Sequence, residues 1–560
     1  MRSTTGSMFF ADAIEAAGIG HLFFVPVVLT PSLVALQKRG ITPVCTHSEK
    51  SAAYMADGYA RASGGPGLCL SQTVGAANLA AGLRDAYLAR SPVIAVTGGK
   101  SPEGKYRGVY QEIDDFAMYE PVTKFNVQVD SAERLTDLLP QAFRAATSGC
   151  PGPVHLECAG LMGQAIDGAV EAVHEFDDRF FHVPAFRSPA DPEDVARVVD
   201  VLRRAERPVL VAGGGVAASK AEAEVVQLAR KLSIPVATSL NAKGTIPEDD
   251  LLSIGVVGLY SRECSNKIVC QADLVFFVGS ATGSQVTNGW QVPPSGTRVV
   301  QLDIDGENVG RNYPNVASLC GDARTVLQQL IEACDPQDRD GWLNSCQEQV
   351  QSWRADVQPL VQADTLPLRP ERICDELGEA LPNDAILVAE TGHAGIWTAR
   401  YTEIRSSGQK YVRAAGSLGW GFPAAMGAKC AAPDRPVICF SGDGGFYYHM
   451  SEMETAVRYG INVVVIVNNN RSLNMEKELY ADAYGEKEQS HGLEMWQFEE
   501  MNFAKVAEAM GCFATRVERP GELGPAIRTA LAAGRPAIVD VVSDINLLAP
   551  IGWSPPKDAS

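Results

Sequence analysis

Residues 437–470 constrain the fold of this chain more than any other stretch. Two short apolar runs rich in β-branched residues lie at its ends, which is typical of strands buried on both faces. Between them, Met453, Ala456 and Val457 recur at helical spacing, and Gly460 predicts the end of that helix. A strand, a helix and a strand in so short a span predict a βαβ unit with a right-handed crossover, and therefore a doubly wound α/β sheet.

Polar residues fall where the two strands of this unit end, which is where open α/β sheets bind ligands. Asp443 lies between two glycines, so the backbone can approach a ligand closely and leave the carboxylate pointing at it. Asn469 and Asn470 end the second strand at the same edge. Carboxylate and amide oxygens suit Mg²⁺ or Ca²⁺, and the amides that begin the next helix would receive a phosphate. The alternative is that residues 442–445 form an ordinary turn and that the two asparagines only cap local structure.

The segment Gly442-Asp-Gly, the spacer and Asn469-Asn470 resemble the diphosphate-binding motif of thiamine-diphosphate (ThDP) enzymes. This resemblance implies that Asp443 and Asn470 are side-chain ligands of Mg²⁺ and that Ser472 offers its backbone carbonyl. The residues that it places around the cofactor at this edge are Gly442, Asp443, Gly444, Gly445, Asn470, Leu473 and Met475.

A length of 560 residues predicts about three domains. The alternation of strands and helices predicts three doubly wound parallel-sheet domains, at 1–185, 190–335 and 371–545. The resemblance to ThDP enzymes implies that the first binds the pyrimidine, that the second is a Rossmann-like central domain and that the third binds the diphosphate. Residues 336–370 are polar and are predicted to form a helical connector. In the first domain, residues 152–157 are expected to close the sheet.

Composition limits the class of protein. The net charge of −19 argues against a nucleic-acid partner, whose backbone must be met by clustered Lys and Arg. No apolar run reaches the roughly 18–20 residues that span a bilayer, and the N-terminus resembles an amphipathic helix, not a secretory signal. The 13 cysteines include no Cys-x-x-Cys pair, so we expect buried thiols in a reducing cytoplasm.

Glu49 lies at the mouth of a predicted strand and begins a helix rich in small residues. It could be an acid favoured by the helix dipole, or an acid poised for proton transfer. The stretch from His47 to Arg61 is similar to the segment of ThDP enzymes that carries their essential glutamate, which bonds the aminopyrimidine N1′ and promotes loss of the C2 proton. By this resemblance Glu49 is catalytic, and Val27 and Asn78 contact the cofactor.

Residues 106–126 resemble the first domain of acetolactate synthases, in which the glutamine at the position of Gln111 lines the active site. The His-His pair of decarboxylases that release free aldehyde is missing, which counts against a simple pyruvate decarboxylase. Acetolactate synthases carry a tryptophan near the position of Leu479, and this chain does not. The roles of His491, Glu494 and Trp496 in the following segment stay open.

In the third domain, Gly392 and His393 match the region that touches the diphosphate in ThDP enzymes. The stretch after Gly416 corresponds to the turn whose bulky apolar residue holds the cofactor in its bent form. That residue would be Leu418, with Ser417 beside it, and the bend would make the proton transfer intramolecular.

The central domain has three glycines after a strand, Gly213 to Gly215, which we expect to open one helix that continues through Arg230. The full dinucleotide fingerprint is absent. Relatives in the ThDP family use this domain for FAD, for ADP or CoA, or as a scaffold only. The flavin-associated stretch of acetolactate synthases is missing here, so FAD is in doubt and the occupant stays open.

The resemblance implies a ThDP- and Mg²⁺-dependent decarboxylase and carboligase of acetolactate synthase type that acts on a small 2-oxo acid or acyl substrate. The alternatives are a 2-hydroxyacyl-CoA lyase or oxalyl-CoA decarboxylase-like enzyme, and a noncatalytic paralogue that binds ThDP. The sequence supports a fourth interpretation, a dehydrogenase that uses the three glycines, less than any of these. Because the first domain of one subunit meets the third domain of another in this family, we expect a homodimer or homotetramer.

Overall fold

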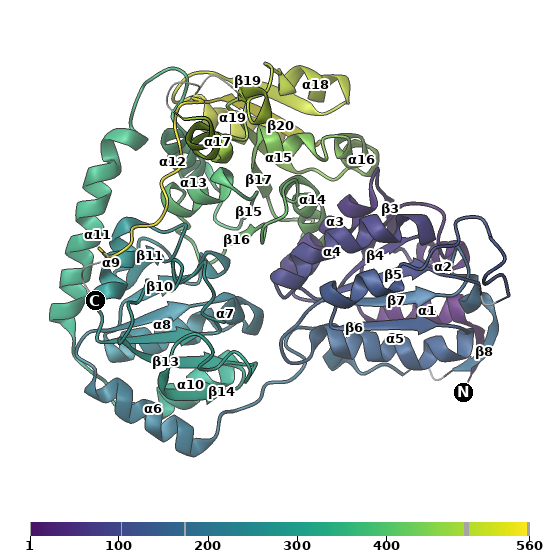
Figure 1. The fold of residues 1–560 in the computed structure, drawn as a ribbon, viewed down its shortest axis with the longest axis horizontal. Helices are drawn as coiled ribbons and strands as arrows, with labels where there is room; N and C mark the ends of the chain where they lie inside the picture. Colours follow the sequence, from purple (N-terminus) through teal and green to yellow (C-terminus); the bar gives the residue numbers. More distant parts are fainter. Residues whose placement is uncertain (1, 102, 173–174, 486–491, 557–560) are drawn as a thin grey trace.

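The computed structural model describes residues 2–101, 103–172, 175–485 and 492–556, which form three lobes (Figure 1). Each lobe is built on a six-stranded sheet in which all paired strands run parallel, as predicted. In Figure 1 the first sheet lies at the right, the second at the lower left and the third at the top. The predicted connector contains the long helix α11 (Asp340–Val361), which runs from the second lobe to the third along the left edge.

The first sheet has the strand order β3-β2-β4-β5-β7-β6. Its strands are β2 (His21–Phe24), β3 (Thr42–Cys45), β4 (Gly67–Ser71), β5 (Val93–Gly98), β6 (Phe125–Val129) and β7 (Val154–Cys158). Its helices are α1 (Gly6–Ala16), α2 (Thr30–Gln37), α3 (Glu49–Ser63), α4 (Ala76–Leu88) and α5 (Ala132–Thr147), and β1 (Arg2–Thr5) pairs antiparallel with β8 (Ala169–Ala172). The prediction that residues 152–157 close the sheet is wrong. The half-exposed β6 forms the edge, and its apolar residues Phe125, Val127 and Val129 alternate with polar ones, a short strand pattern that the prediction did not use.

The second sheet has the order β11-β10-β9-β12-β13-β14, that of a classic dinucleotide-binding fold. Its strands are β9 (Pro208–Ala212), β10 (Val236–Thr238), β11 (Ser253–Val256), β12 (Leu274–Val278), β13 (Arg298–Asp303) and β14 (Asn315–Cys320). Its helices are α6 (Pro192–Arg204), α7 (Gly214–Ser219), α8 (Glu222–Leu232), α9 (Glu263–Gln271) and α10 (Ala323–Ala333). The single helix expected after Gly213 is wrong, because Lys220 is left-handed (φ 53°) and separates α7 from α8.

The third sheet has the order β16-β15-β17-β18-β20-β19. Its strands are β15 (Ile386–Ala389), β16 (Lys410–Arg413), β17 (Val437–Gly442), β18 (Val464–Asn469), β19 (Phe513–Val517) and β20 (Ala537–Val542). Its helices are α12 (Pro370–Ala380), α13 (His393–Tyr401), α14 (Gly421–Ala431), α15 (Asp443–Tyr447), α16 (Glu452–Tyr459), α17 (Lys477–Tyr484), α18 (Phe503–Ala509) and α19 (Leu523–Ala532). The predicted βαβ unit is present. Met453 and Ala456 are buried as expected, whereas Val457 is 38% exposed and does not belong to the buried face.

Helices α3 and α14 join the first and third lobes, whose buried side chains form one continuous core. A Cβ atom on Gly58 would lie 2.0 Å from the Ala424 carbonyl oxygen, and one on Gly427 would lie 1.8 Å from that of Met55. Glycine is therefore required at both crossings, which explains the small residues of α3. Trp420, at the start of α14, donates its indole N–H to the buried carboxylate of Asp57 at 2.9 Å.

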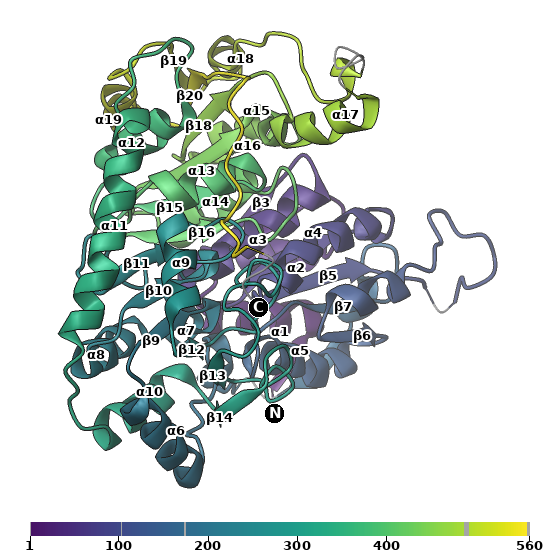
Figure 2. The same cartoon turned by 60° about the vertical axis from the view of Figure 1, so that its left-hand side comes forward.

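The C-terminal segment returns from the third lobe to the second, where it ends near α9 (Figure 2). The backbone N–H of Gly552 donates to the Leu259 carbonyl, and the Asn266 side chain donates to the Trp553 carbonyl at 2.8 Å. In the described part of the chain no helix is long and apolar enough to cross a membrane. All thirteen cysteines lie in that part, and each carries a free thiol.

Candidate active site

Asp443 is the central residue at the carboxyl edge of the third sheet. It follows β17, which ends between β15 and β18, and its side chain is only 1% exposed. One carboxylate oxygen accepts the Gly444 N–H at 2.8 Å and the other accepts the Ser472 N–H at 3.2 Å. Burial raises the pKa of Asp443 to about 7, although these N–H groups oppose the rise. Among the described residues no cationic side chain pairs with it, so the carboxylate is ready for a positive ion.

Further oxygen atoms converge beside Asp443. Asn470 and Ser472 are both buried, and the Ser472 hydroxyl donates to the Asn470 side-chain oxygen at 2.9 Å. This oxygen, the carboxylate and a backbone carbonyl are the hard donors that Mg²⁺ prefers. Asn469, in contrast, is used structurally, because its amide donates to Asp540 at 2.8 Å and to the Met501 carbonyl. The donors present therefore fit a magnesium ion.

The glycines around Asp443 leave room that side chains would fill. A Cβ on Gly444 would lie 2.5 Å from the Leu473 side chain, and one on Gly445 would lie 2.8 Å from that of Glu390. A Cβ on Gly442 would meet nothing within 4 Å. The amides that begin α15 are thus held between two neighbouring loops, with open space on the side of Gly442. This cradle fits a diphosphate.

The loop after β15 contributes Gly392, His393 and a carboxylate that sequence reasoning missed. Gly392 is left-handed (φ 63°), and a Cβ there would approach the Met475 sulfur at 3.7 Å. Burial lowers the pKa of His393 to about 4, so its ring is neutral, and its Nδ1 has no partner among the described residues. Glu390 accepts the N–H groups of Thr391 and Gly421 at 2.9 and 2.8 Å, and burial raises its pKa to about 7.

The turn that carries Ser417 and Leu418 is held from the first lobe. Asp85, which is fully buried in α4, accepts the backbone N–H groups of Ala415, Gly416 and Ser417 at 2.9 to 3.1 Å. Leu418 is half-buried beside the left-handed Gly419 (φ 88°). Asp85 was not predicted as a site residue, because a contact across 330 residues leaves no local signal.

Glu49 lies at the carboxyl edge of the first sheet, as the first residue of α3. Asn78 donates its side-chain N–H to one Glu49 oxygen at 3.2 Å. A Cβ on Gly75 would lie 2.4 Å from the other oxygen, so only glycine leaves Glu49 where it is. Val27, in the loop after β2, is 46% exposed. The first lobe thus presents a half-buried carboxylate with one polar side-chain partner.

Gln111 belongs to a loop that follows β5 and stands out from the body of the molecule (Figure 2). Its backbone is left-handed (φ 60°) and its side chain is half-buried. No hydrogen bond or ion pair among the described residues joins Gln111, Glu49 or Asn78 to Asp443 and its neighbours. One chain therefore places its predicted site residues in separate groups.

The segment after Asn470 is positioned by a residue whose role the sequence left open. Trp496 is buried, and its carbonyl accepts the Leu473 N–H at 2.7 Å. Its ring lies 5.7 Å from the Lys477 ammonium group. Glu494 is exposed, and His491 lies outside the described residues. Trp496 thus fixes the chain that covers Gly444.

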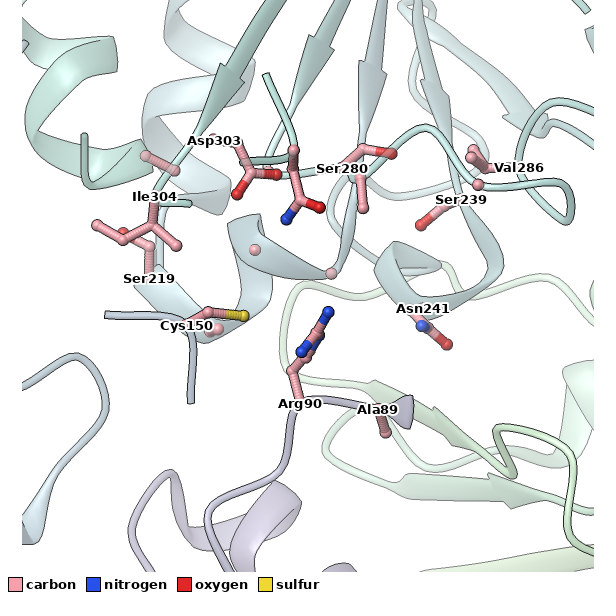
Figure 3. A pocket seen from close by; sticks show the side chains of 18 of the residues that line it. Ala89, Arg90, Cys150, Ser219, Ser239, Asn241, Ser280, Val286, Asp303 and Ile304 are labelled. Atoms are coloured by element: carbon pink, nitrogen blue, oxygen red, sulfur yellow. The ribbon is translucent and has the colours of Figure 1, made fainter. Parts of the chain in front are cut away.

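A separate cavity of ≈ 490 Å³ lies at the carboxyl edge of the second sheet (Figure 3). Asp303 and Ser280 reach it from the strand ends, and Arg90 enters from the first lobe. Two of the three predicted glycines have a packing reason here, because Cβ atoms on Gly213 and Gly215 would lie 2.2 and 2.7 Å from backbone atoms of Gly279. The cavity has the position and the polar groups of a nucleotide site.

Comparison with known proteins agrees with this geometry. Residues 4–118 match the N-terminal TPP binding domain of thiamine pyrophosphate enzymes, residues 195–330 match their central domain, and residues 390–541 match their C-terminal TPP binding domain. A probable acetolactate synthase large subunit of Methanocaldococcus jannaschii is 31% identical over 96% of this chain and 92% of its own length.

Two further relatives span similar lengths. The glyoxylate carboligase of Escherichia coli O157:H7 is 30% identical over 98% of this chain and 93% of its own. An acetolactate synthase of Arthrospira platensis is 29% identical over 97% and 94%. Each of the three lobes thus contains a range that matches a domain of these enzymes. The chain belongs to the thiamine pyrophosphate enzyme family, within its acetolactate synthase-like group.

Proposed function

We propose that this chain decarboxylates a small 2-oxo acid with ThDP and Mg²⁺ and joins the remaining acyl unit to a second carbonyl compound. The observation that carries the proposal is Asp443, a buried carboxylate that has no cationic partner in the described part of the chain and lies beside the oxygens of Asn470 and Ser472. Relatives named acetolactate synthase and glyoxylate carboligase support this class of reaction.

Asp443, Asn470 and the Ser472 carbonyl would hold Mg²⁺, and the amides after Gly442 would bind the diphosphate. When bound, ThDP would supply a carbon that adds to a carbonyl once its proton has been removed, and a thiazolium ring that accepts the electrons of the broken bond. Neutral His393 would offer a hydrogen bond without adding charge. Leu418, on a turn fixed by Asp85, would hold the cofactor in its bent form.

In the first lobe, Glu49 would hold a proton at the ring nitrogen of the aminopyrimidine, and Asn78 orients its carboxylate. Val27 and Gln111 would shape the substrate end. Because these groups do not meet Asp443 within one chain, we propose a homodimer or homotetramer in which the first lobe of one protomer faces the third lobe of another. Exposed aromatic side chains on the loop of Gln111 support this, since Tyr106 is 88% and Tyr110 is 78% exposed.

The same proposal includes the domain bounds 1–185, 190–335 and 371–545, each of which contains one six-stranded sheet. It also places the protein in the cytoplasm, where free thiols persist.

The test is release of CO₂ from pyruvate by protein loaded with ThDP and Mg²⁺, with identification of the carbon products. We expect prompt release and an acetolactate- or acetoin-like product. Release of free acetaldehyde alone would contradict carboligation. If ThDP binds and no CO₂ appears, the proposed donor is wrong, and larger 2-oxo acids and CoA thioesters are the next donors to assay.

The cavity of Figure 3 favours a second candidate, an enzyme that acts on a CoA thioester. Asp303 could accept from ribose hydroxyls, and Arg90 could meet a phosphate. FAD and ADP would use the same groups. Titration with ADP, CoA and FAD separates these occupants, and Ile304→Glu, which adds a carboxylate to this cavity, should weaken whichever binds. Turnover of an acyl-CoA donor with no turnover of pyruvate would establish the second candidate.

A further inference from the structure

A second, larger cavity of ≈ 1060 Å³ lies where all three lobes meet. It is bordered by the end of α3, the start of α8, the segment 241–250 and the strand β16. It shares part of its lining with the cavity of Figure 3, but none of the residues around Asp443 or Glu49 borders it. Its basic residues are Arg61, Arg90, Lys220, Arg230, Lys243, Lys410, Arg413 and Arg435, and its acidic residues are Glu222 and Asp250.

Three of these cations are neutralised within the structure. Arg61 pairs with Asp57 and Asp85, Arg230 pairs with Asp250, and Lys243 pairs with Glu248. The other five have no carboxylate within ion-pair distance in the described ranges. They are Arg90, Lys220, Lys410, Arg413 and Arg435. Among the described residues that line the cavity, one carboxylate is unpaired, that of Glu222, in a chain whose net charge is −19.

Neutral carbonyl groups satisfy some of these donors without cancelling their charge. Lys410 donates to the Arg61 carbonyl at the end of α3, and Arg435 donates to the carbonyls of Asp384 and Gly408. A helix C-terminus supplies only about half a negative charge, too little for five cations. Burial lowers the pKa of Lys410 to about 8; Glu222 opposes the shift, and Arg435 and Lys220 add to it. Arg435 and Lys220 thus repel the Lys410 ammonium group.

We propose that this cavity binds a small anion that carries two phosphate groups. Five unpaired cations and one carboxylate leave about four positive charges, and two phosphate groups carry roughly three to four negative charges at neutral pH. One carboxylate or one phosphate would leave the repulsion largely in place. Lysine and arginine at the wall provide the charge-assisted donors that phosphate oxygens accept.

The position of this cavity also connects it to the candidate active site. Arg61 donates to the Arg413 carbonyl at 2.6 Å and to Asp85 at 3.1 Å. Asp85 in turn fixes the turn that carries Leu418. Binding at Lys410 and Arg413 therefore acts on residues that hold this turn, which makes the anion an effector of the proposed reaction. This step rests on the proposed function, whereas the binding itself does not.

The test uses the full-length protein saturated with ThDP and Mg²⁺ and fructose 1,6-bisphosphate as a probe in calorimetric titration. We expect one saturable site per chain, and at least tenfold weaker binding of inorganic phosphate. Lys220→Met, at an exposed position, should raise the Kd about tenfold, and the double variant with Lys410→Met about a hundredfold. Lys38→Met removes an exposed charge outside the cavity and should leave the Kd unchanged.

Ile304→Glu separates the two cavities, because this residue borders only the one in Figure 3. Unchanged binding in this variant supports the proposal, and loss of binding there would move the anion to that cavity and overturn it. Absence of a saturable site in the wild type, or wild-type affinity in Lys220→Met, would also overturn it. The readout is binding, so it does not depend on pyruvate being the substrate.

Discussion

Asp443 and Glu49, the two carboxylates of the candidate active site, differ in how closely the surrounding residues of this chain enclose them. Asp443 is 1% exposed, and backbone N–H groups of its own lobe hold both of its oxygens. Glu49 is half-buried and has one polar side-chain partner, Asn78, and a glycine that makes room for it. A fixed, buried carboxylate suits a metal ligand, and a more accessible one suits proton exchange. The difference in burial matches the two proposed roles.

The largest effect is expected at the accessible carboxylate. Glu49→Gln keeps the shape and the hydrogen bond from Asn78 but cannot take up or release a proton, so kcat should fall by roughly 10²–10⁴. The affinity for ThDP and Mg²⁺ should stay near the wild-type value, because Asp443 is untouched. Steady-state kinetics and cofactor titration by tryptophan fluorescence measure the two quantities. A variant with wild-type kcat would remove Glu49 from the mechanism.

The reciprocal variant tests the fixed carboxylate. Asp443→Asn removes the charge and places an amide donor opposite a backbone N–H donor, so the affinity for Mg²⁺ should fall by at least about 10–100-fold. Measured with saturating metal, kcat should recover more than it does in Glu49→Gln. If both variants lost kcat equally and neither lost metal affinity, the division of roles between the two edges would be wrong.

Prediction from the sequence succeeds where structure is local. The βαβ unit around Asp443 lies within 34 residues, so its strand ends, glycines and asparagines can all be identified in one short stretch of sequence. The parallel sheets and the family follow from such windows and are confirmed. The strand β6 was missed although its apolar and polar residues alternate, because a pattern of five residues is too short to separate an edge strand from a loop. The break at Lys220 was missed because a left-handed lysine has no sequence signature.

The supports of the site were harder to predict, because they join distant parts of the chain. Asp85 binds a turn 330 residues away, and Trp496 fixes the Leu473 backbone through its own carbonyl. The sequence around Glu390 shows only an acidic residue after a strand. Its contacts with Gly421 and Gly445 arise from the fold. The assignments of Glu49, Gln111 and the other site residues to roles stay predictions, which the variants above and below address.

Glu390 extends the comparison to a buried carboxylate that is not a proposed ligand. Its pKa is about 7 in the folded protein and near 4.5 when exposed, so the folded state holds its proton more tightly. The associated stability is complete below pH 4.5 and is lost as the pH rises through 7, by up to ~3 kcal/mol. Glu390→Gln lacks this titration. Denaturant unfolding at pH 5 and pH 8 should show a larger loss in the wild type than in the variant, and parallel losses would contradict the assignment.

The smallest effect is expected from a substitution that crowds the Glu49 carboxylate. Gly75→Ala would place a methyl group 2.4 Å from a Glu49 oxygen, so the carboxylate must turn away, and kcat should fall about tenfold while cofactor affinity changes little. Gly341→Ala, where an added Cβ meets nothing within 4 Å, serves as the matched control and should keep the wild-type rate. A larger loss in Gly75→Ala, with wild-type unfolding, would mean that Glu49 is held as rigidly as Asp443. No loss would mean that the proton can be exchanged from more than one position, and that Gly75 is required only for packing.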